Sequence, residues 1–391
     1  MVKWLDQEFF ELALRTGYGD PNIEVGQISL RTGTHDGDNY ISSVYRSILS
    51  YRNRKTNVVR PHLEMIVKLI AAKMSTSLSD CVPFQTEVAM YQEIIPQIEN
   101  LLHESVAPRL LYATKKPYHA LVYEDAYQNG YRVVNIRHDL ENTLFIADKL
   151  GKWHAATYHL GKRQPNNMQH FDRGLFSHKN AEGVKFIQNT LDIFINVAIY
   201  WSGFDKYVQK MNSFRSKFEQ NMKKLYEIER NDKFTVLNHG DLNYHNILLK
   251  YDETHNRLVD LLFIDFQLSV FGTAAIDLYC LLFLITTDEV RDFRSQILRH
   301  YHSSFVKALQ SFGYSDNIPT FDDLNDEMEK FNFLEIVMAV CIMPFFYVGI
   351  VNKKEKDDKA ARFDPDLRKK IFHLEEYKNF IEPVLAEHFN C

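Results

Sequence analysis

Residues 236–249, Val-Leu-Asn-His-Gly-Asp-Leu-Asn-Tyr-His-Asn-Ile-Leu-Leu, decide the fold of this chain. An apolar entry leads into His239-Gly240-Asp241, and Asn246 follows after four further residues at the head of a predicted short strand. The carboxylate of Asp241 can accept a hydroxyl proton, and the amide oxygen of Asn246 can bind a magnesium ion. The two residues bracket a tight loop whose spacing is typical of the catalytic loop of phosphoryl-transfer enzymes of the protein-kinase type.

A third candidate residue stands one predicted hairpin further along the chain. The turn 252–257 leads into the apolar strand 258–264, which ends in Asp265-Phe266-Gln267. An acidic residue in that position is the natural second metal ligand. We therefore predict a catalytic hairpin over 236–267, with Asp241 as the base and with Asn246 and Asp265 as magnesium ligands.

The composition is that of an ordinary globular protein. The chain has 391 residues, enough for two lobes, with 45% hydrophobic and 25% charged residues. Its net charge of -5 favours neither nucleic acid nor an anionic membrane as a partner, and no protein partner is evident. The four cysteines are scattered singly, which indicates a reducing compartment. The first residues carry acids and resemble no signal peptide, so we expect a cytoplasmic location.

The N-terminal third is predicted to be rich in strands. A short amphipathic helix near 5–15 comes first, and a second helix is expected over 84–95, ended or kinked by Pro96. The apolar and alternating patterns between and after these helices predict strands at 23–30, 43–51, 63–70, 109–113 and 119–123. We expect these strands to form a small five-stranded antiparallel sheet.

A glycine-containing loop separates the first two predicted strands. Gly33, Gly37 and Asn39 lie in it, and their backbone N–H groups could cover the phosphates of a nucleotide. The Walker pattern is absent, and any hairpin can hold two glycines, so the loop by itself is a weak indication.

Lys68 is placed in an otherwise apolar predicted strand. A lysine there is commonly an edge-strand residue or one that extends its amine to solvent. The functional alternative is a lysine that contacts phosphate and is held by a carboxylate of the next helix, where Glu87 can point toward the sheet. Further on, Glu124-Asp125 ends an apolar strand and fits either a hinge whose backbone binds a purine edge or a surface loop.

From about residue 138 the hydrophobic period becomes helical. Helices are predicted over 138–159, 183–200, 203–229, 272–287, 289–311, 321–350 and 366–388, and the apolar run 331–350 is interpreted as a buried helix because it contains Asn332, Glu335 and Pro344. The predicted fold is α+β with two lobes: a nucleotide-binding sheet lobe over 1–124 and a helical lobe with the acceptor pocket over 125–391.

Together these residues resemble the ecdysteroid kinase-like group of small-molecule kinases, within the wider choline kinase and aminoglycoside phosphotransferase class. Asp-Phe-Gln in place of Asp-Phe-Gly argues against a eukaryotic protein kinase. Residues 242–245 depart from the set typical of the ecdysteroid branch. The matching stretches are Gly37 to Tyr40 with Tyr45-Arg46, Ile66 to Lys68, Phe84 to Tyr91, Leu121 to Asp125, Trp153 to Ala155, residues 236–246, Phe263 to Gln267, and Gly272 with Asp277-Leu278.

The resemblance implies a two-lobed protein-kinase-like fold with ATP held between the lobes. Gly33 to Asn39 would cover the phosphates, Lys68 held by Glu87 would contact them, and the adenine would meet the backbone near Glu124. Mg²⁺ would be bound by Asn246 and Asp265. His239 would brace the catalytic loop by hydrogen bonding, with proton transfer as the alternative role. Asp277 would bind backbone N–H groups of the loop, and its plainer explanation is a helix N-terminal acid.

The acceptor is implied to be a small hydroxylated molecule, such as an ecdysteroid-like steroid or a xenobiotic alcohol. The aromatic residues of 186–204 and 345–347 could line an apolar pocket, and His245 could touch the acceptor or face solvent. One alternative is a kinase for a cationic substrate, with Asp252, Glu253, Asp288 and Glu289 as candidate acidic residues. Another is a kinase-fold binding protein without turnover, which would normally lack one of Lys68, Asp241, Asn246 or Asp265.

Overall fold

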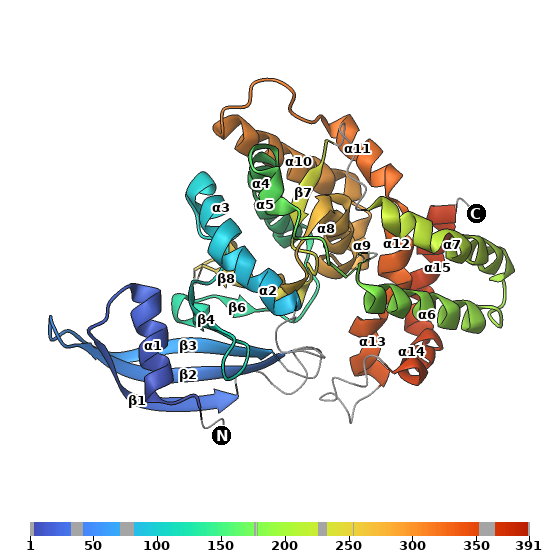
Figure 1. Cartoon of the computed structure of the whole chain (residues 1–391). Coiled ribbons are helices and arrows are strands. Elements are labelled where there is room, and N and C mark those ends of the chain that lie inside the picture. The colour runs from blue at the N-terminus through green and yellow to red at the C-terminus, as the bar shows by residue number, and fades with distance from the viewer. Residues whose placement is uncertain are drawn as a thin grey trace. The chain divides into compact units, whose positions relative to one another are not determined.

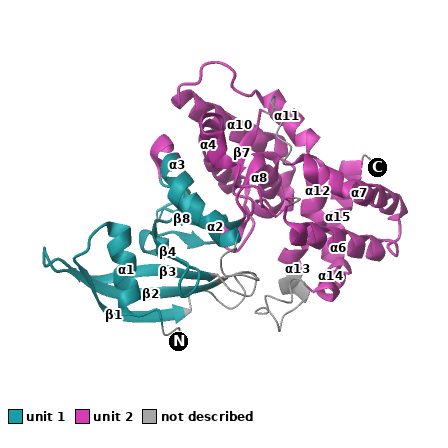
Figure 2. Cartoon of the chain, in the orientation of Figure 1, with its two compact units in different colours: residues 1–97, 105–133, 248–267 teal, residues 98–104, 134–247, 268–391 magenta. Residues whose placement is uncertain are grey.

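The computed structural model describes residues 4–32, 42–70, 82–175, 177, 179–225, 233–252, 254–351 and 364–389 (Figure 1). The predicted phosphate-covering residues Gly33, Gly37 and Asn39 and the candidate Glu253 lie outside these ranges. The chain divides into two compact units (Figure 2), residues 1–97, 105–133 and 248–267 in the first and residues 98–104, 134–247 and 268–391 in the second.

The first unit is built on a five-stranded antiparallel sheet, as expected. Its strands are β1 (Ile23–Thr32), β2 (Ser42–Asn53), β3 (Val59–Ile70), β4 (Leu110–Thr114) and β5 (Ala120–Glu124), in the spatial order β1-β2-β3-β5-β4. Helix α1 (Gln7–Tyr18) lies along this sheet (Figure 1), and its buried residues Phe10, Ala13 and Leu14 pack with Val25, Met65 and Val67 of the strands. Alternating apolar residues of the strands thus supply one face of a small core.

The catalytic hairpin is shared between the two units. Strands β8 (Ile247–Tyr251) and β9 (Leu258–Phe263) form a second, three-stranded sheet with β6 (Arg132–Val133), in the order β6-β8-β9. Strand β6 pairs with β8 through Arg132 opposite Leu249. This pairing joins residues 126–133 to 248–267, and the bonds from Gln128 to Glu64 and from Lys68 to Asp265 connect both segments to the N-terminal sheet. Both segments therefore belong to the first unit, whereas the sequence suggested a simple division at residue 125.

Helices make up most of the second unit. Strand β7 (Thr235–Asn238) pairs antiparallel with β10 (Val270–Thr273) and ends at the catalytic loop. The helices of this unit are α4 (Leu140–Arg163), α5 (Pro165–Met168), α6 (Ala181–Ala198), α7 (Asp205–Lys224), α8 (Ala275–Cys280), α9 (Asp288–Arg291), α10 (Arg294–Ser311), α11 (Phe321–Lys330), α12 (Phe333–Ile336), α13 (Pro344–Val351), α14 (Pro365–Phe372) and α15 (Glu375–Phe389). The mixed α+β class predicted from the sequence is therefore confirmed.

The helices predicted over 272–287 and 321–350 differ from the structure. Gly272 belongs to strand β10, where it lies opposite Val236, and the helix begins only at Ala275. The single helix expected over 321–350 is broken into α11, α12, a π-helical segment Val337–Ile342 and α13. Asn332 precedes α12, and Pro344 begins α13, where its missing N–H is not needed. The buried character predicted for this run is confirmed for residues 333–341.

Pro96 does not end the helix in the first third of the chain. Helix α2 (Val82–Ala89) passes through a π-helical segment, Met90–Ile94, into α3 (Ile95–Leu102). Ile95 donates its N–H to the carbonyl of Met90, five residues back, immediately before the proline. The wide turn accommodates the ring, so the helix continues beyond it.

Within the described ranges, no single helix is both long and apolar enough to cross a membrane.

Candidate active site

Lys68 lies in the middle of the N-terminal sheet. It stands opposite Val44 of β2 and Leu121 of β5, so its strand is internal, and only 6% of the residue is exposed. The edge-strand explanation is therefore wrong. Its Nζ lies 2.6 Å from Glu87 Oε2 and 2.7 Å from Asp265 Oδ1. Burial opposes the ammonium charge, yet the carboxylates of Asp265 and Glu87 raise the pKa of Lys68 above its ordinary value, so it is protonated at neutral pH.

Glu87 is held from two sides on helix α2. One oxygen accepts from Lys68, and the other accepts from the hydroxyl of Tyr123 at 2.9 Å. Burial raises the pKa of this carboxyl, in opposition to the nearby ammonium group of Lys68. Tyr123, at the end of β5, was not singled out from the sequence, because a tyrosine in an apolar strand normally signals only packing.

Asp265 follows β9 in a left-handed backbone conformation, with φ of 68°. Such a conformation is uncommon for a residue with a side chain, and it turns the carboxylate out of the strand direction. Its Oδ1 meets Lys68 and its Oδ2 lies 3.4 Å from Gln267 Nε2. The ring of Phe266, next in the chain, packs edge-on against Tyr91 at a centroid distance of 5.4 Å and anchors the segment. Lys68, Glu87 and Asp265 thus form one cluster within the first unit.

Asp241 is oriented by two amides of its own loop. Asn243 Nδ2 lies 3.1 Å from Asp241 Oδ1, and Asn246 Nδ2 lies 3.0 Å from Oδ2 and 2.9 Å from the backbone carbonyl. The amide nitrogen of Asn246 thus faces Asp241, and its oxygen remains as the group that could bind a cation. The sequence analysis missed Asn243, although an asparagine between Asp241 and Asn246 is suited to accept and donate hydrogen bonds within the loop.

The start of the catalytic loop is fastened to helix α8. Asp277, which is fully buried, accepts the N–H of His239 at 2.6 Å and the N–H of Gly240 at 3.0 Å. His239 Nδ1 in turn accepts the N–H of Asp241 at 3.3 Å. Gly240 has a φ of 81°, and a Cβ there would lie 2.0 Å from the carbonyl oxygen of Leu268. Only glycine fits this turn, because the position is both left-handed and closely approached.

A second layer of buried hydrogen bonds lies behind Asp277. His154 of α4 places Nε2 at 3.3 Å from Asp277 Oδ2, and its Nδ1 lies 2.8 Å from the hydroxyl of Tyr301 on α10. All three side chains are fully buried. His154, in the stretch Trp153 to Ala155 that resembles the family, is thus a buried histidine that contacts the carboxylate holding the catalytic loop. Tyr301 was not identified, since a tyrosine at helical spacing carries no special signal.

The backbone N–H groups of Glu124 and Asp125, at the predicted hinge, both have partners within the protein. Its N–H is donated to the carbonyl of Arg109 at 3.0 Å, and the N–H of Asp125 is donated to Glu64 at 3.1 Å. The Glu124 carboxylate accepts from Tyr18 at 3.1 Å. Asp125 is buried and pairs with Arg46 at 2.5 Å. A purine edge would therefore have to use backbone groups other than these two N–H groups.

The loop residues that depart from the family pattern carry an aromatic cluster. The rings of Tyr244 and His245 pack against Phe346 of α13, with centroid distances of 5.1 and 6.1 Å, and His245 and Phe346 are stacked at 7°. These side chains are half-buried and belong to the same unit as Asp241.

Asp288, a candidate for binding a cationic substrate, is already paired. Arg137 contacts its two oxygens at 2.6 and 3.3 Å, and Arg291 contacts Oδ1 at 3.1 Å. Two guanidinium groups thus share one carboxylate, and the local charge is positive. Burial raises the pKa of Asp288, but Arg137 outweighs it and brings the pKa below its ordinary value.

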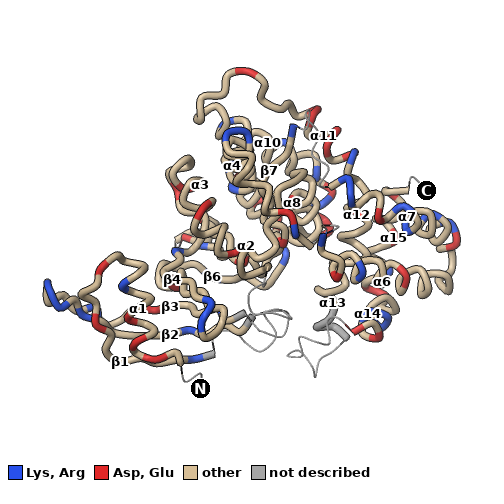
Figure 3. The backbone as a smooth tube through the Cα atoms, in the orientation of Figure 1, with Lys and Arg blue, Asp and Glu red and all other residues tan. Residues whose placement is uncertain are grey.

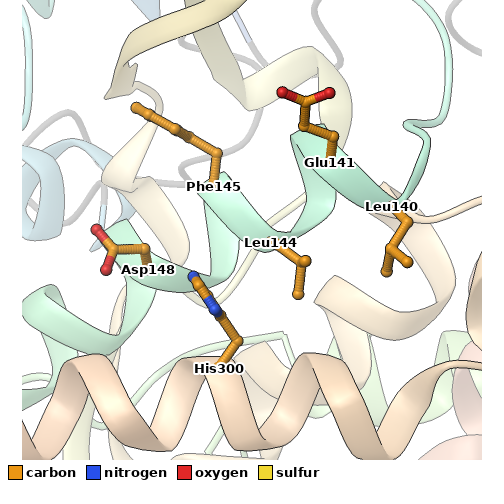
Figure 4. A pocket seen from close by; sticks show the side chains of 6 residues that line it. All are labelled: Leu140, Glu141, Leu144, Phe145, Asp148 and His300. Atoms are coloured by element: carbon orange, nitrogen blue, oxygen red, sulfur yellow. The ribbon is translucent and has the colours of Figure 1, made fainter.

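A separate open pocket of about 570 Å³ lies between α4 and α10 (Figure 4). Leu140 and Leu144 of α4 and His300 of α10 point toward it, and Glu141, Phe145 and Asp148 complete the lining. None of the predicted site residues contributes to it.

The donor set suits a hard cation. Asp265 and Asn246 would supply a carboxylate and an amide oxygen, which are the ligands that Mg²⁺ prefers. Elsewhere in the described ranges no three histidine, cysteine, aspartate or glutamate side chains gather as a metal-binding group. Because the two residues belong to different units, a shared metal ion stays a prediction.

Comparison with known proteins identifies the family. The model of the ecdysteroid kinase-like family matches residues 36–314, which include Lys68, Glu87, Asp241, Asn246 and Asp265. The chain belongs to the ecdysteroid kinase-like family. It is thus a member of a family of small-molecule kinase-like phosphotransferases, and ATP use is implied by that membership. A search of the curated proteins finds no match.

Solved structures similar to this family member are also small-molecule kinases. They include the macrolide 2'-phosphotransferase MphH of Brachybacterium faecium, with 12% identity, a TM-score of 0.41, and coverage of 92% of this chain and 99% of that one. A choline/ethanolamine kinase family protein of Mesorhizobium loti has 12% identity and a TM-score of 0.38, with 97% and 99% covered. A microcompartment-associated aminopropanol kinase has 10% identity and a TM-score of 0.44, with 97% and 98% covered.

Proposed function

We propose that this protein transfers the γ-phosphoryl group of ATP to a hydroxyl group of a small, largely apolar molecule. The observation that carries the proposal is the arrangement of the two residue groups. Lys68, Glu87 and Asp265 are bonded together in one unit, and Asp241 with Asn246 is held on a braced loop in the other. These are the parts that phosphoryl transfer requires, and both groups must act on the same nucleotide.

Each residue has a defined task in the proposed reaction. Lys68 contributes a permanent positive charge for phosphate oxygens, and Glu87 with Tyr123 holds it in place. Asp241 accepts the proton of the acceptor hydroxyl while the new oxygen–phosphorus bond forms and the bond to the ADP oxygen breaks. Magnesium, when bound by Asn246 and Asp265, neutralises phosphate charge. Since the transition state is loose, rigid positioning of these groups supplies most of the catalysis.

The acceptor class follows from the surface attached to the base. Tyr244 and His245 follow Asp241 by three and four residues in the same loop. The Tyr244 ring packs against Phe346 and the His245 ring stacks on it, so an acceptor bound there would meet aromatic rings. A planar apolar alcohol, such as a steroid or xenobiotic alcohol, suits such a surface.

The pairing of Asp288 with two arginines weighs against the cationic alternative. Among the four acids named for that alternative, Asp288 is held by Arg137 and Arg291 and would have to exchange them for the cationic substrate. A non-catalytic binding protein is disfavoured because the chain has all four residues that such a protein would normally lack in part, namely Lys68, Asp241, Asn246 and Asp265.

A product assay tests the proposal. The protein is incubated with ATP, Mg²⁺ and separate pools of steroid alcohols, cationic alcohols and aminoglycosides, and mass spectrometry detects a phosphate-sized gain. We expect products from the apolar pool, and a loss of at least about a hundredfold in rate for Asp241→Asn. Asp326→Asn, an exposed change on α11, serves as the control. Products only from the cationic pools, or full activity of Asp241→Asn, would refute the proposal.

A further inference from the structure

The hairpin that joins β2 to β3 ends in an exposed basic tip. We define the hairpin tip as residues 52–60, and the structure shows every residue from Arg54 to His62 exposed. Four cations lie in it, Arg52, Arg54, Lys55 and Arg60, and the sequence contains no acid from residue 42 to residue 63. Figure 3 shows this blue segment at the free end of the two strands. On a chain of net charge -5, such a local excess of positive charge needs an explanation.

The neighbouring acids do not cancel this charge. Glu24 of β1 is shared by Arg52, at 2.6 Å, and Arg54, and these two arginines lower the pKa of Glu24 to about 2. Asp20 is engaged by the amides of Asn22 and Asn53. Four cations therefore face two carboxylates, and Lys55 and Arg60 form no ion pair among the described residues.

The hairpin tip also presents two adjacent valines to solvent. Val58 is 52% exposed and Val59 is 60% exposed, and Val59 stands opposite Arg52 in the strand register. Few large apolar side chains of the described structure are as exposed, and these two are neighbours in sequence. The two valines therefore form a small apolar patch beside the cations of the hairpin tip.

The tip is held in a defined conformation. Asn53 Oδ1 accepts the N–H groups of Lys55 and Thr56 at 2.9 Å, and Asn53 donates its own N–H to the carbonyl of Val58 at 2.9 Å. Asn57 takes the left-handed conformation that the turn requires, with φ of 55°. Because the turn is ordered, the valines and the cations are presented together without further loss of backbone freedom on binding.

We propose that the hairpin tip docks on an anionic lipid membrane. The guanidinium and ammonium groups would contact lipid phosphates and carboxylates, and Val58 and Val59 would insert between the headgroups. A basic patch joined to a small apolar wedge is the combination that gives reversible membrane binding. A nucleic acid is less well matched, since the tip has no aromatic ring for base stacking. The expectation of no membrane partner rested on the net charge, which averages over the whole chain and hides this local patch.

The proposal is independent of the acceptor that the enzyme phosphorylates. Docking on a membrane would nevertheless bring the enzyme to the lipid bilayer, in which an apolar alcohol dissolves.

Vesicle flotation with the full chain tests the docking. Vesicles of phosphatidylcholine alone are compared with vesicles that also contain phosphatidylserine. We expect binding only to the anionic vesicles, weakening as salt is added because the attraction is screened. The double variant Val58→Asp, Val59→Asp and the triple variant Arg54→Gln, Lys55→Gln, Arg60→Gln should each bind at least about tenfold more weakly.

Val259→Asp is the control, because this valine is 47% exposed and its strand β9 belongs to the three-stranded sheet, not to the sheet that carries the tip. It should bind as the wild type does. Equal urea midpoints for all variants show that folding is unchanged. Failure of the wild type to bind anionic vesicles would overturn the proposal, as would equal binding by the valine and control variants. Binding to a DNA duplex but not to vesicles would overturn it in favour of a nucleic-acid partner.

Discussion

Replacing Asp277 by asparagine should loosen the catalytic loop. The carboxylate of this buried residue accepts the N–H groups of His239 and Gly240, and His154 approaches the same carboxylate. An asparagine keeps one acceptor oxygen and turns an NH₂ group toward the second N–H. One charge-assisted bond is lost, and a buried donor is left without a partner. We expect the loop to be destabilised by about 3 kcal/mol.

Amide hydrogen exchange measures this effect at the loop itself. A change of about 3 kcal/mol in local opening corresponds to roughly a hundredfold faster exchange for peptides covering residues 236–246. Peptides from α10 should change less, since α10 reaches Asp277 indirectly, through the contact of Tyr301 with His154. The exposed Asp326→Asn change is the control, with an expected effect within about 0.5 kcal/mol. Wild-type exchange of 236–246 in the Asp277→Asn protein would refute the idea that this carboxylate holds the loop.

Two further predictions concern folding. Gly240→Ala should lower the free energy of unfolding, measured by urea denaturation, by more than about 3 kcal/mol, because the left-handed backbone disfavours a Cβ and the carbonyl oxygen of Leu268 would lie 2.0 Å from that Cβ. Gly313→Ala, also left-handed but with no close neighbour within 4 Å, should lower it by only about 1 kcal/mol. Equal losses for the two variants would contradict the close-approach argument. Burial lowers the pKa of His138 below that of the unfolded chain, so the neutral imidazole contributes fully to stability above about pH 6.5, and this contribution falls as acid protonates the unfolded chain first. In His138→Gln the urea midpoint should therefore depend less on pH between pH 7.5 and 5 than in the wild type. The same pH dependence in both proteins would show that this histidine is not responsible.

The short spacings between the catalytic residues explain how much of the site could be predicted. Asp241, Asn246 and Asp265 are recognisable because the chemistry needs specific side chains at short spacings, and a short loop or hairpin preserves spacing in any fold. The alternation and apolar runs likewise predicted the five strands. Lys68 was ambiguous, since its environment depends on which strands flank β3, and pairing with β5 involves residues about fifty positions away.

Other features depended on partners distant in sequence. Tyr123 and Tyr301 became part of the site only because β5 lies beside β3 and α10 packs on α4. The pairing of Asp288 with Arg137 joins residues 151 positions apart. The last two residues of β10, Gly272 and Thr273, were predicted to begin a helix because a strand of four residues has too little periodicity to be recognised. Its pairing with β7 overrides local preference.

The sequence by itself determined the α+β class, the family resemblance and the residues that carry the chemistry, because these follow from side-chain identity and short-range spacing. Tertiary structure alone decided which residues hold that chemistry in place: Tyr123 on Glu87, Asp277 on the loop N–H groups, and Tyr301 behind His154. It also decided that Val58 and Val59 stand exposed among cations at the hairpin tip. Burial and long-range hydrogen bonds arise only when distant segments pack, and no local pattern encodes them.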